Sequence, residues 1–230
     1  MAKLFTEDEV VGLARQAYDH GDAAFELEAH RAALLVIDLQ DEFLRPGWTP
    51  YWIPEATRQV PHVKTLLEAC RRLDVPVIYT VFSATHRNLD RPASGATMPN
   101  RFRMIENDPA WFRDGVVWHE LAPRDDEIVI HKPSYGAFYD TPLQTILGNL
   151  GRDTIIVCGT LTNYCCGTTA RQGYERGFMV VVGSDVCATD DPVAHDVELR
   201  TLRRGFARVL TSEAIIAALE ASAGQPAGRA

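Results

Sequence analysis

A carboxylate, an ammonium and a thiol each follow a different apolar segment of this sequence. Asp38 directly ends one apolar run, Lys132 follows a second such segment and Cys165 comes shortly after a third. Together they provide a base, an electrostatic partner and a nucleophile, which are the groups that nucleophilic catalysis requires. In an open parallel sheet, ligands bind outside the carboxyl ends of the strands. If the three segments are such strands, the sheet brings these groups to one edge.

The local sequence of Cys165 favours a reactive thiol. Residues 159–165 read GTLTNYC, which predicts a tight strand-to-helix turn with the cysteine in the first turn of its helix. There the helix dipole and free backbone N–H groups lower the pKa of a thiol. The N–H groups of Leu161 and Cys165 are candidates for an oxyanion hole. The alternative is a small cysteine that fills space between helix and strand, as we expect of Cys70 and Cys158.

Asp38 and Lys132 also have purely structural interpretations. Asp38 could cap a helix or pair with an arginine, and Lys132 could be a solvated lysine at a strand end. A carboxylate at the end of an apolar strand is costly unless it is compensated. We therefore expect Asp38→Asn, although nearly inactive, to be more stable than the wild type. The combination of all three groups favours catalysis more strongly than any one of them does.

The adjacent pair Cys165 and Cys166 leaves a third possibility, a redox-sensing or non-catalytic protein. Neighbouring side chains on a helix point about 100° apart, however, and a disulfide between adjacent residues is strained. The seven histidines are scattered, and the sequence has no CxxC pair and no glycine-rich phosphate loop. We therefore predict no metal site and no cofactor.

The elements that must position these residues alternate between strands and helices. Strands are predicted over 32–37, 76–82, 127–131, 154–158, 178–182 and 207–210. Helices are predicted over 6–18, 61–74, 141–149, 164–176 and 191–204, with a last helix from Ser212. This alternation predicts an α/β fold with a single doubly wound, mostly parallel sheet and helices on both faces, a three-layer α/β/α arrangement. Its parts are an N-terminal helical arm (1–30), a main domain (31–222) and a flexible tail (223–230).

Composition excludes several classes of protein. The 230 residues are 46% hydrophobic and 23% charged, with a formal net charge of −8. The acidic balance argues against a nucleic-acid partner, and no apolar run approaches the ~20 residues of a membrane helix. Five cysteines at irregular spacing do not form a disulfide framework. We expect a cytoplasmic protein with a small-molecule substrate.

Three segments resemble the motifs of the isochorismatase-like cysteine hydrolase family. They are LLVIDLQDEFL (34–44), HKPSYGAFYDTPL (131–143) and VCGTLTNYCCGTTARQGYERGF (157–178). Their order and spacing agree with the family, and the resemblance covers about 31–215. It implies an isochorismatase-like fold in which Asp38, Lys132 and Cys165 are catalytic. It also implies a cis peptide bond at Thr160–Leu161.

The same resemblance separates two reactions. Many isochorismatases, which cleave a vinyl ether, have no cysteine at the nucleophile position, whereas this chain has Cys165. That favours the amidohydrolase branch, which cleaves a C–N bond through a covalent thioester. Isochorismatase-type cleavage driven by Asp38 stays open, because the sequence around Asp38 also resembles that side of the family. The DxH metal motif of nicotinamidases is absent from the stretch Ser83–His86, which disfavours a metal-dependent nicotinamidase.

The pocket and the assembly are also predicted. Loops 44–60 and 83–118 should wall the pocket, and the aromatic candidates that line it are Phe43, Trp48, Tyr135 and Phe138. They suggest a small, flat or partly apolar substrate. One arginine of the second loop could bind a substrate group, although a solvated loop is the alternative; the candidates are Arg87, Arg91, Arg101 and Arg103. Relatives are usually dimers or tetramers, and the apolar stripe of the arm needs a cover. We therefore predict a homodimer or homotetramer.

Overall fold

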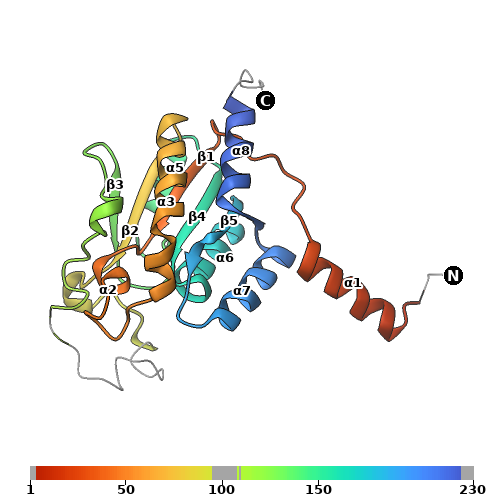
Figure 1. Ribbon diagram of the computed structural model, residues 1–230, viewed down its shortest axis with the longest axis horizontal. Helices are drawn as coiled ribbons and strands as arrows, with labels where there is room; N and C mark the ends of the chain where they lie inside the picture. The colour runs from red at the N-terminus through yellow and green to blue at the C-terminus, as the bar shows by residue number, and fades with distance from the viewer. Residues whose placement is uncertain (1–3, 95–107, 109, 224–230) are drawn as a thin grey trace.

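The computed structural model, which describes residues 4–94, 108 and 110–223, contains a six-stranded parallel sheet (Figure 1). The strands are β1 (Ala32–Ile37), β2 (Val77–Phe82), β3 (Ile128–Lys132), β4 (Thr154–Thr160), β5 (Met179–Ala188) and β6 (Arg208–Leu210). Their order in the sheet is β3-β2-β1-β4-β5-β6, and every neighbouring pair is parallel. The order reverses beside β1, so a crevice is expected at the carboxyl ends of β1 and β4.

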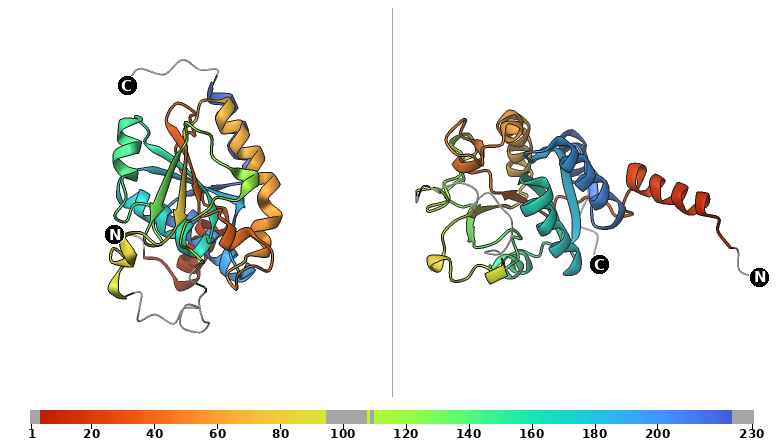
Figure 2. Two further views of the ribbon diagram at one scale, coloured as in Figure 1. Left: turned by 90° about the vertical axis from the view of Figure 1, so that its left-hand side faces the viewer. Right: turned by 90° about the horizontal axis from the view of Figure 1, so that it is seen from below.

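Helices cover both faces of the sheet, as Figures 1 and 2 show. One face packs against α3 (Pro54–Arg72) and α8 (Ser212–Ala223), and the other packs against α5 (Leu143–Asn149), α6 (Gly167–Glu175) and α7 (Pro192–Gly205). β1 is buried along its whole length, with alternate side chains in the two cores. This is the burial expected for a central strand of a parallel sheet. The predicted doubly wound α/β fold is confirmed.

Several elements begin or end at residues other than those predicted. α3 starts at Pro54 and includes Pro61, where the sequence pattern had placed the start of the helix. Pro54 occupies the first helical turn, where a missing N–H has no cost. β5 continues to Ala188, and its register with β4 shifts between Val157 and Gly159. The connection from β1 to α3 contains the short helix α2 (Asp41–Leu44). The connection from β2 to β3 contains the 3₁₀ turns His86–Asn88 and His119–Leu121.

The predicted N-terminal arm forms α1 (Glu7–His20), which projects away from the domain (Figures 1 and 2). Thr6 and Glu9 form the capping box at its start. No residue of α1 is buried, and the arm touches α7 through its C-terminal end, where the Arg204 guanidinium lies 4.5 Å from the Tyr18 ring. Residues 7–13 of α1 are exposed, whereas Leu27 and Ala29, in the segment between α1 and β1, are buried against the domain.

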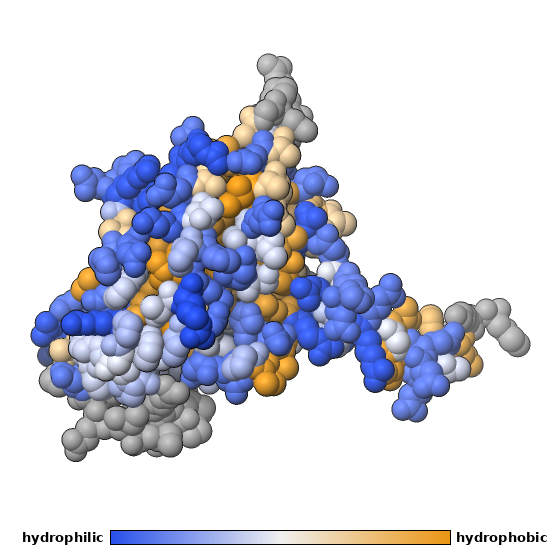
Figure 3. All heavy atoms as spheres, in the orientation of Figure 1, coloured by the Kyte–Doolittle hydropathy of each residue, from blue (hydrophilic) through white to orange (hydrophobic). Residues whose placement is uncertain are grey.

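Apolar side chains remain exposed along the arm, where Figure 3 shows hydrophobic residues among charged ones. Val10 is 54% and Leu13 is 57% exposed. At the other end of the chain, α8 extends through Ala223, the first residue of the predicted tail, and the remaining tail residues lie outside the described part. No helix among the described residues is long and apolar enough to cross a membrane.

Candidate active site

Asp38 is held in an unusual backbone conformation at the end of β1. Its φ angle is +51°, a left-handed value that is uncommon for a residue other than glycine. The Asp38 N–H donates to the Thr80 carbonyl at 2.9 Å, and the Thr160 hydroxyl donates to the Asp38 carbonyl at 2.8 Å. The Thr80 hydroxyl also donates to Oδ1 at 3.1 Å. Both neighbouring strands therefore fix this residue, as is typical of strained residues at functional sites.

Lys132 is the last residue of β3 and is fully buried. It pairs in the parallel ladder with Phe82, the last residue of β2. Its Nζ donates to the Ser134 carbonyl at 2.9 Å and lies 5.3 Å from the Phe82 ring centroid. A buried ammonium needs charged or polar partners. The solvated lysine that was the structural alternative is therefore excluded by its burial.

Cys165 lies in a π-helical turn, Thr162–Cys166, which connects β4 to α6. It therefore precedes the α-helix whose first turn it was predicted to occupy. The Thr160–Leu161 peptide bond at the start of the turn is cis. Gly159 has a φ of +132°, and a Cβ there would lie 1.9 Å from the Ile37 carbonyl oxygen. Glycine is required because β4 approaches β1 closely, and this approach sets the turn beside Asp38.

The three predicted side chains meet at the carboxyl edge of the sheet. Lys132 Nζ lies 2.7 Å from Asp38 Oδ2 and donates to Cys165 Sγ at 3.5 Å. Asp38 and Lys132 are both 0% exposed, and Cys165 is 3% exposed. The ammonium thus contacts the carboxylate and the sulfur at once.

Burial is the largest single influence on the pKa values of Asp38, Lys132 and Cys165. Burial raises the pKa of Asp38, although Lys132 and hydrogen bonds to Cys165 and Thr80 act in the opposite direction. Burial alone lowers the pKa of Lys132, but its interactions with Asp38 and Cys165 outweigh this effect, so the pKa is raised. Burial raises the pKa of Cys165 to about 12, despite the nearby Lys132. The resting site therefore holds an ion pair beside a neutral thiol.

The expected lowering of the Cys165 pKa was wrong. That prediction rested on the helix dipole, but the buried thiol gains less from its cationic neighbour than it loses by desolvation. A thiol of this kind needs an adjacent base to take its proton during the reaction. The Asp38 carboxylate hydrogen bonds to this thiol.

Side chains from α7 and from the residue after β5 hold the turn that carries Cys165. The Thr162 hydroxyl lies 2.9 Å from Nδ1 of His195 on α7. The Thr189 hydroxyl, next after β5, donates to Oδ1 of Asn163 at 2.7 Å. These contacts fix the backbone on which Cys165 stands. Neither was predicted, because they depend on how α7 packs beside the turn.

Cys166 has a different environment from Cys165. It is fully buried in the core beneath α6 and hydrogen bonds to Cys187. All five cysteines of the chain are free thiols. Cys166 is therefore a packing residue in this structure.

The structure places the predicted pocket residues in different environments. Tyr135 is 41% exposed and stacks on Tyr164, with 5.4 Å between ring centroids. Burial raises the pKa of the Tyr135 hydroxyl, and Cys165 acts in the same direction. Phe138 instead packs in the core, with its centroid 5.6 Å from that of Phe178 at the amino end of β5. Tyr135 therefore lies beside Tyr164 of the turn that carries Cys165, whereas Phe138 belongs to the core.

Phe43, in α2, and Trp48 lie in the connection after β1. Phe43 is buried, and its ring lies 5.4 Å from that of Phe112. Phe112 in turn lies 5.6 Å from Phe82, the ring beside Lys132. Trp48 is partly exposed and stacks under the Arg45 guanidinium. Phe43, Phe112 and Phe82 therefore form a row of neighbouring rings beside Lys132, called the aromatic wall below.

A buried polar pair that the sequence analysis missed fixes this wall. The Gln40 amide exchanges two hydrogen bonds with the Phe82 backbone, at 2.8 and 3.0 Å, and donates to Glu42 at 2.7 Å. Glu42 accepts from the Phe112 N–H at 2.8 Å. The sequence signal for this pair was the presence of two polar residues, Gln40 and Glu42, so close to Asp38. The pair ties the end of β2 to the loop that carries Phe112.

Among the loop arginines, Arg101 and Arg103 lie outside the described residues. Arg87 is exposed, whereas Arg91 is partly buried. His86 is also exposed, and its Nδ1 lies 2.9 Å from Asp90. Within the described part of the chain, no three His, Cys, Asp or Glu side chains gather so that they could hold a metal ion.

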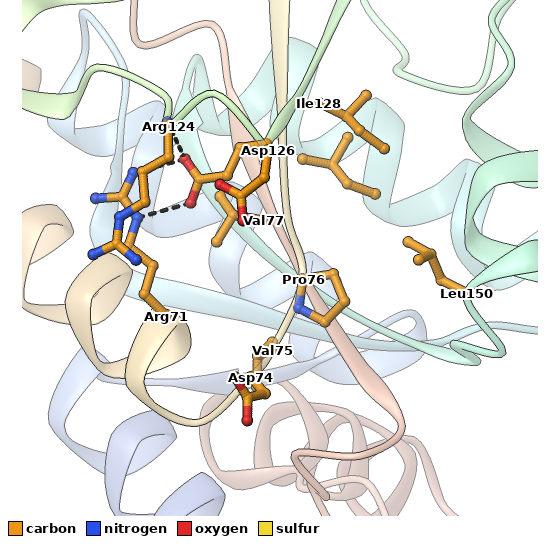
Figure 4. A pocket seen from close by; sticks show the side chains of 11 residues that line it. Arg71, Asp74, Val75, Pro76, Val77, Arg124, Asp126, Ile128 and Leu150 are labelled. Carbon is orange, nitrogen blue, oxygen red and sulfur yellow. Dashed lines mark hydrogen bonds and ion pairs between the residues drawn. The ribbon is translucent and has the colours of Figure 1, made fainter.

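A cavity of about 280 Å³ lies at the opposite edge of the sheet from the candidate active site (Figure 4). Its lining includes Val77 and Ile128, the first residues of β2 and β3. The Arg71 guanidinium in its wall is already paired with Glu127 at 2.7 Å. The reactive groups follow the other ends of these strands, so this cavity is separate from them.

A model of the isochorismatase domain matches residues 32–214 of the chain. The chain belongs to the isochorismatase family. The match covers the whole sheet and every residue of the Asp38–Lys132–Cys165 group. It leaves out α1, so the arm lies outside the family domain.

Similar family members include both named enzymes and uncharacterised proteins. The isochorismatase family protein YecD of Escherichia coli O157:H7 is 30% identical, over 84% of this chain and 99% of its own length. Nicotinamidase 3 of Arabidopsis thaliana is 32% identical, over 76% of this chain and 82% of its own length. A cysteine hydrolase from Pseudomonas syringae pv. phaseolicola 1448A has a TM-score of 0.77 at 30% identity, covering 89% of this chain and 99% of that structure. The resemblance to isochorismatase-like cysteine hydrolases is thus confirmed.

Proposed function

We propose that this hydrolase cleaves the C–N bond of a small amide, carbamoyl or ureido compound through a covalent thioester on Cys165. The observation that carries the proposal is the buried Lys132 ammonium, in contact with Asp38 at 2.7 Å and with Cys165 at 3.5 Å. A carboxylate base, a thiol and a cation in one buried group are the parts of a nucleophilic acyl-transfer site. The similarity to a nicotinamidase supports an amide as the substrate.

In the first step, Asp38 takes the proton of the Cys165 thiol as sulfur attacks the carbonyl carbon. The raised pKa of Asp38 makes it a stronger base than an ordinary carboxylate. Lys132 stabilises the negative charge on sulfur as it develops. The carbonyl π electrons move to oxygen, where the N–H groups of Leu161 and Cys165 bind the oxyanion.

In the second step, the C–N bond breaks and the nitrogen leaves with its electron pair. Asp38 returns its proton to that nitrogen, which releases ammonia or an amine and leaves an acyl group on Cys165. Water then attacks the thioester, and Asp38 accepts a proton from it. When the C–S bond breaks, sulfur regains a proton and the acid product leaves. One water molecule is consumed for each bond cleaved.

An ammonia- or amine-release assay across a panel of small amides, carbamoyl and ureido compounds tests this function. The rings of Phe82, beside Lys132, and of Tyr135, beside Tyr164, suit a small, flat or partly apolar substrate. Turnover of at least one C–N substrate, abolished by Cys165→Ser, is expected. A panel in which isochorismate alone turns over would contradict it.

Vinyl ether cleavage of the isochorismatase type is the second candidate. It needs a carboxylic acid that protonates the substrate, and burial raises the pKa of Asp38 toward that role. In that reaction Cys165 would take no part in the chemistry. Full retention of activity in Cys165→Ser, together with its loss in Asp38→Asn, would identify this reaction.

A further inference from the structure

The apolar stripe of α1 extends beyond the surface that its own domain covers. The helix contacts α7 near its C-terminal end, where Asp19 pairs with Arg200 at 2.8 Å. Ala17 belongs to the covered part of the stripe and is half-buried, whereas Val10 and Leu13 continue the stripe toward the N-terminus. Both are more than half exposed, and this half of the helix projects away from the domain in Figures 1 and 2.

The face of α7 that contacts α1 also continues beyond this contact. Four residues share that face because they are spaced by four, three and four positions: Val193, Val197, Arg200 and Arg204. The two arginines lie 5.6 and 4.5 Å from the Tyr18 ring of α1. The two valines are 69% and 54% exposed. An uncovered apolar end of α7 therefore lies next to the contact with α1.

The ends of the two helices carry opposite charges. The first turn of α1 is acidic, with Glu7, Asp8 and Glu9, and the last turn of α7 is basic, with Arg203 and Arg204. Neither arginine pairs with a carboxylate in the part of the chain that the structure describes. One donates to a backbone carbonyl at 3.5 Å, and the other lies over a tyrosine ring. The acidic start of another helix would complement this basic end.

The charged and apolar residues of the two faces match when the helices run antiparallel. Along α1, Val10 and Ala14 follow Glu7 by three and seven residues. Along α7, read in the opposite direction, the two exposed valines follow Arg200 by the same three and seven residues. Because both helices rise about 1.5 Å per residue, one register brings the charges together and the apolar side chains together.

A second copy of the chain supplies this antiparallel helix. Each copy has an uncovered half of α1 and an uncovered end of α7, and its own arm projects away from that end (Figure 1). We propose that two copies exchange their arms, so that α1 of each copy lies antiparallel on α7 of the other. A two-fold axis then covers both surfaces in both copies. The exchange is independent of the proposed hydrolysis and assigns a role to α1, which lies outside the matched family domain.

Mixing two variants that each lose one side of the contact tests the exchange. Val10→Asp with Leu13→Asp disables the arm, and Val193→Asp with Val197→Asp disables α7. Each variant alone should have a lower mass than the wild type in light scattering, because both contacts of a symmetric pair are lost. An equimolar mixture should regain the mass of a pair, because the intact arm of one variant meets the intact α7 of the other.

Other modes of pairing give different results. If arms paired only with arms, the α7 variant would keep the wild-type mass, and if α7 paired only with α7, the arm variant would keep it. Either result would overturn the proposal, as would a mixture without mixed pairs or a monomeric wild type. Val116→Asp is the matched control, because Val116 is 55% exposed and lies between β2 and β3. It should leave the mass unchanged, and an effect equal to that of the α7 variant would also overturn the exchange.

A charge exchange at the helix ends tests the antiparallel register without placing charges among the valines. Arg203→Glu with Arg204→Glu should raise the dissociation constant of the pair about 10-fold or more at low salt. Adding Glu7→Arg with Asp8→Arg to the same chain should restore most of the affinity. Thermal melts establish that each variant is folded. A first variant that associates as tightly as the wild type, or a combined variant without recovery, would overturn the proposed pairing.

Discussion

The Lys132 ammonium lies 2.7 Å from the Asp38 carboxylate, and both side chains are closed to solvent. Removing one member of a buried ion pair leaves the other charge without compensation. A substitution of Asp38 or Lys132 alone is therefore expected to leave a buried charge unpaired. The pair also links the stability of the fold to the chemistry of the site.

Asp38→Asn should be nearly inactive and less stable than the wild type. The sequence alone suggested a gain in stability, because a lone buried carboxylate is costly. With Lys132 as its partner, the substitution leaves a buried ammonium unpaired and should lower the free energy of unfolding by about 3–5 kcal/mol. Urea denaturation measures this change.

The double variant Asp38→Asn with Lys132→Met is the control for that prediction. It removes both charges, so its free energy of unfolding should return most of the way to the wild-type value while activity stays absent. A double variant that is no more stable than Asp38→Asn would show that the ion pair is not the source of the loss.

Cys165→Ser and Cys166→Ser should separate catalysis from packing. The first should reduce turnover by about 10³-fold or more and leave the melting temperature within about 2 °C, because a hydroxyl replaces the nucleophile at nearly equal volume. The second should retain most activity and lose about 1–3 kcal/mol of stability, because Cys166 is buried against Cys187. Steady-state kinetics and thermal melts of both variants check this pair. The reverse pattern would mean that Cys166 is the nucleophile.

The pH dependence of Cys165 alkylation follows from its raised pKa. With a thiol pKa of about 12, the thiolate fraction grows through the whole accessible range. The rate of iodoacetamide modification of the resting protein should therefore rise about tenfold per pH unit up to pH 10. A plateau below pH 8 would show that Cys165 rests as a thiolate instead.

The acid limb of the activity profile should reflect Asp38. Its carboxylate must be ionised to accept the thiol proton, and burial raises its pKa. The ordinary pKa of an aspartate is about 4. The fall of kcat/KM toward low pH should accordingly occur at a pH above that value. A profile that stays flat down to pH 4 would contradict this role of Asp38.

The exposed apolar face of α1 predicts self-association. Val10 and Leu13 are more than half exposed, and an isolated helix of this length is marginal in water. We expect the full chain to form a dimer or tetramer, and deletion of residues 1–25 to lower its mass in light scattering. Val10→Asp with Leu13→Asp should have the same effect, whereas Val129→Asp on the edge strand β3 should not. A monomeric full-length chain would contradict this prediction.

The sequence was sufficient for the parts of the site that depend on local pattern. An apolar run that stops at Asp38 predicts a buried strand with a carboxylate at its end. The glycine-containing turn before Cys165 predicts a change from strand to helix. Because parallel strands share their carboxyl edge, these two local patterns were enough to place the reactive groups together.

Features that depend on packing between distant segments could not be predicted. The Asp38 backbone is fixed by Thr80 and Thr160, which become its neighbours only through the order of strands in the sheet. The raised pKa of Cys165 follows from complete burial, which no local pattern shows. The start of α3 was misplaced because Pro61 resembles a helix boundary, although the helix continues through it.

The most direct test of the thioester mechanism is rapid-quench mass spectrometry of the protein during turnover of an amide that it hydrolyses. We predict a transient mass increase equal to the acyl group of that substrate, mapped to the peptide that contains Cys165 and absent in Cys165→Ser. Turnover without any adduct, together with undiminished activity in Cys165→Ser, would contradict the mechanism and assign the reaction to Asp38 alone.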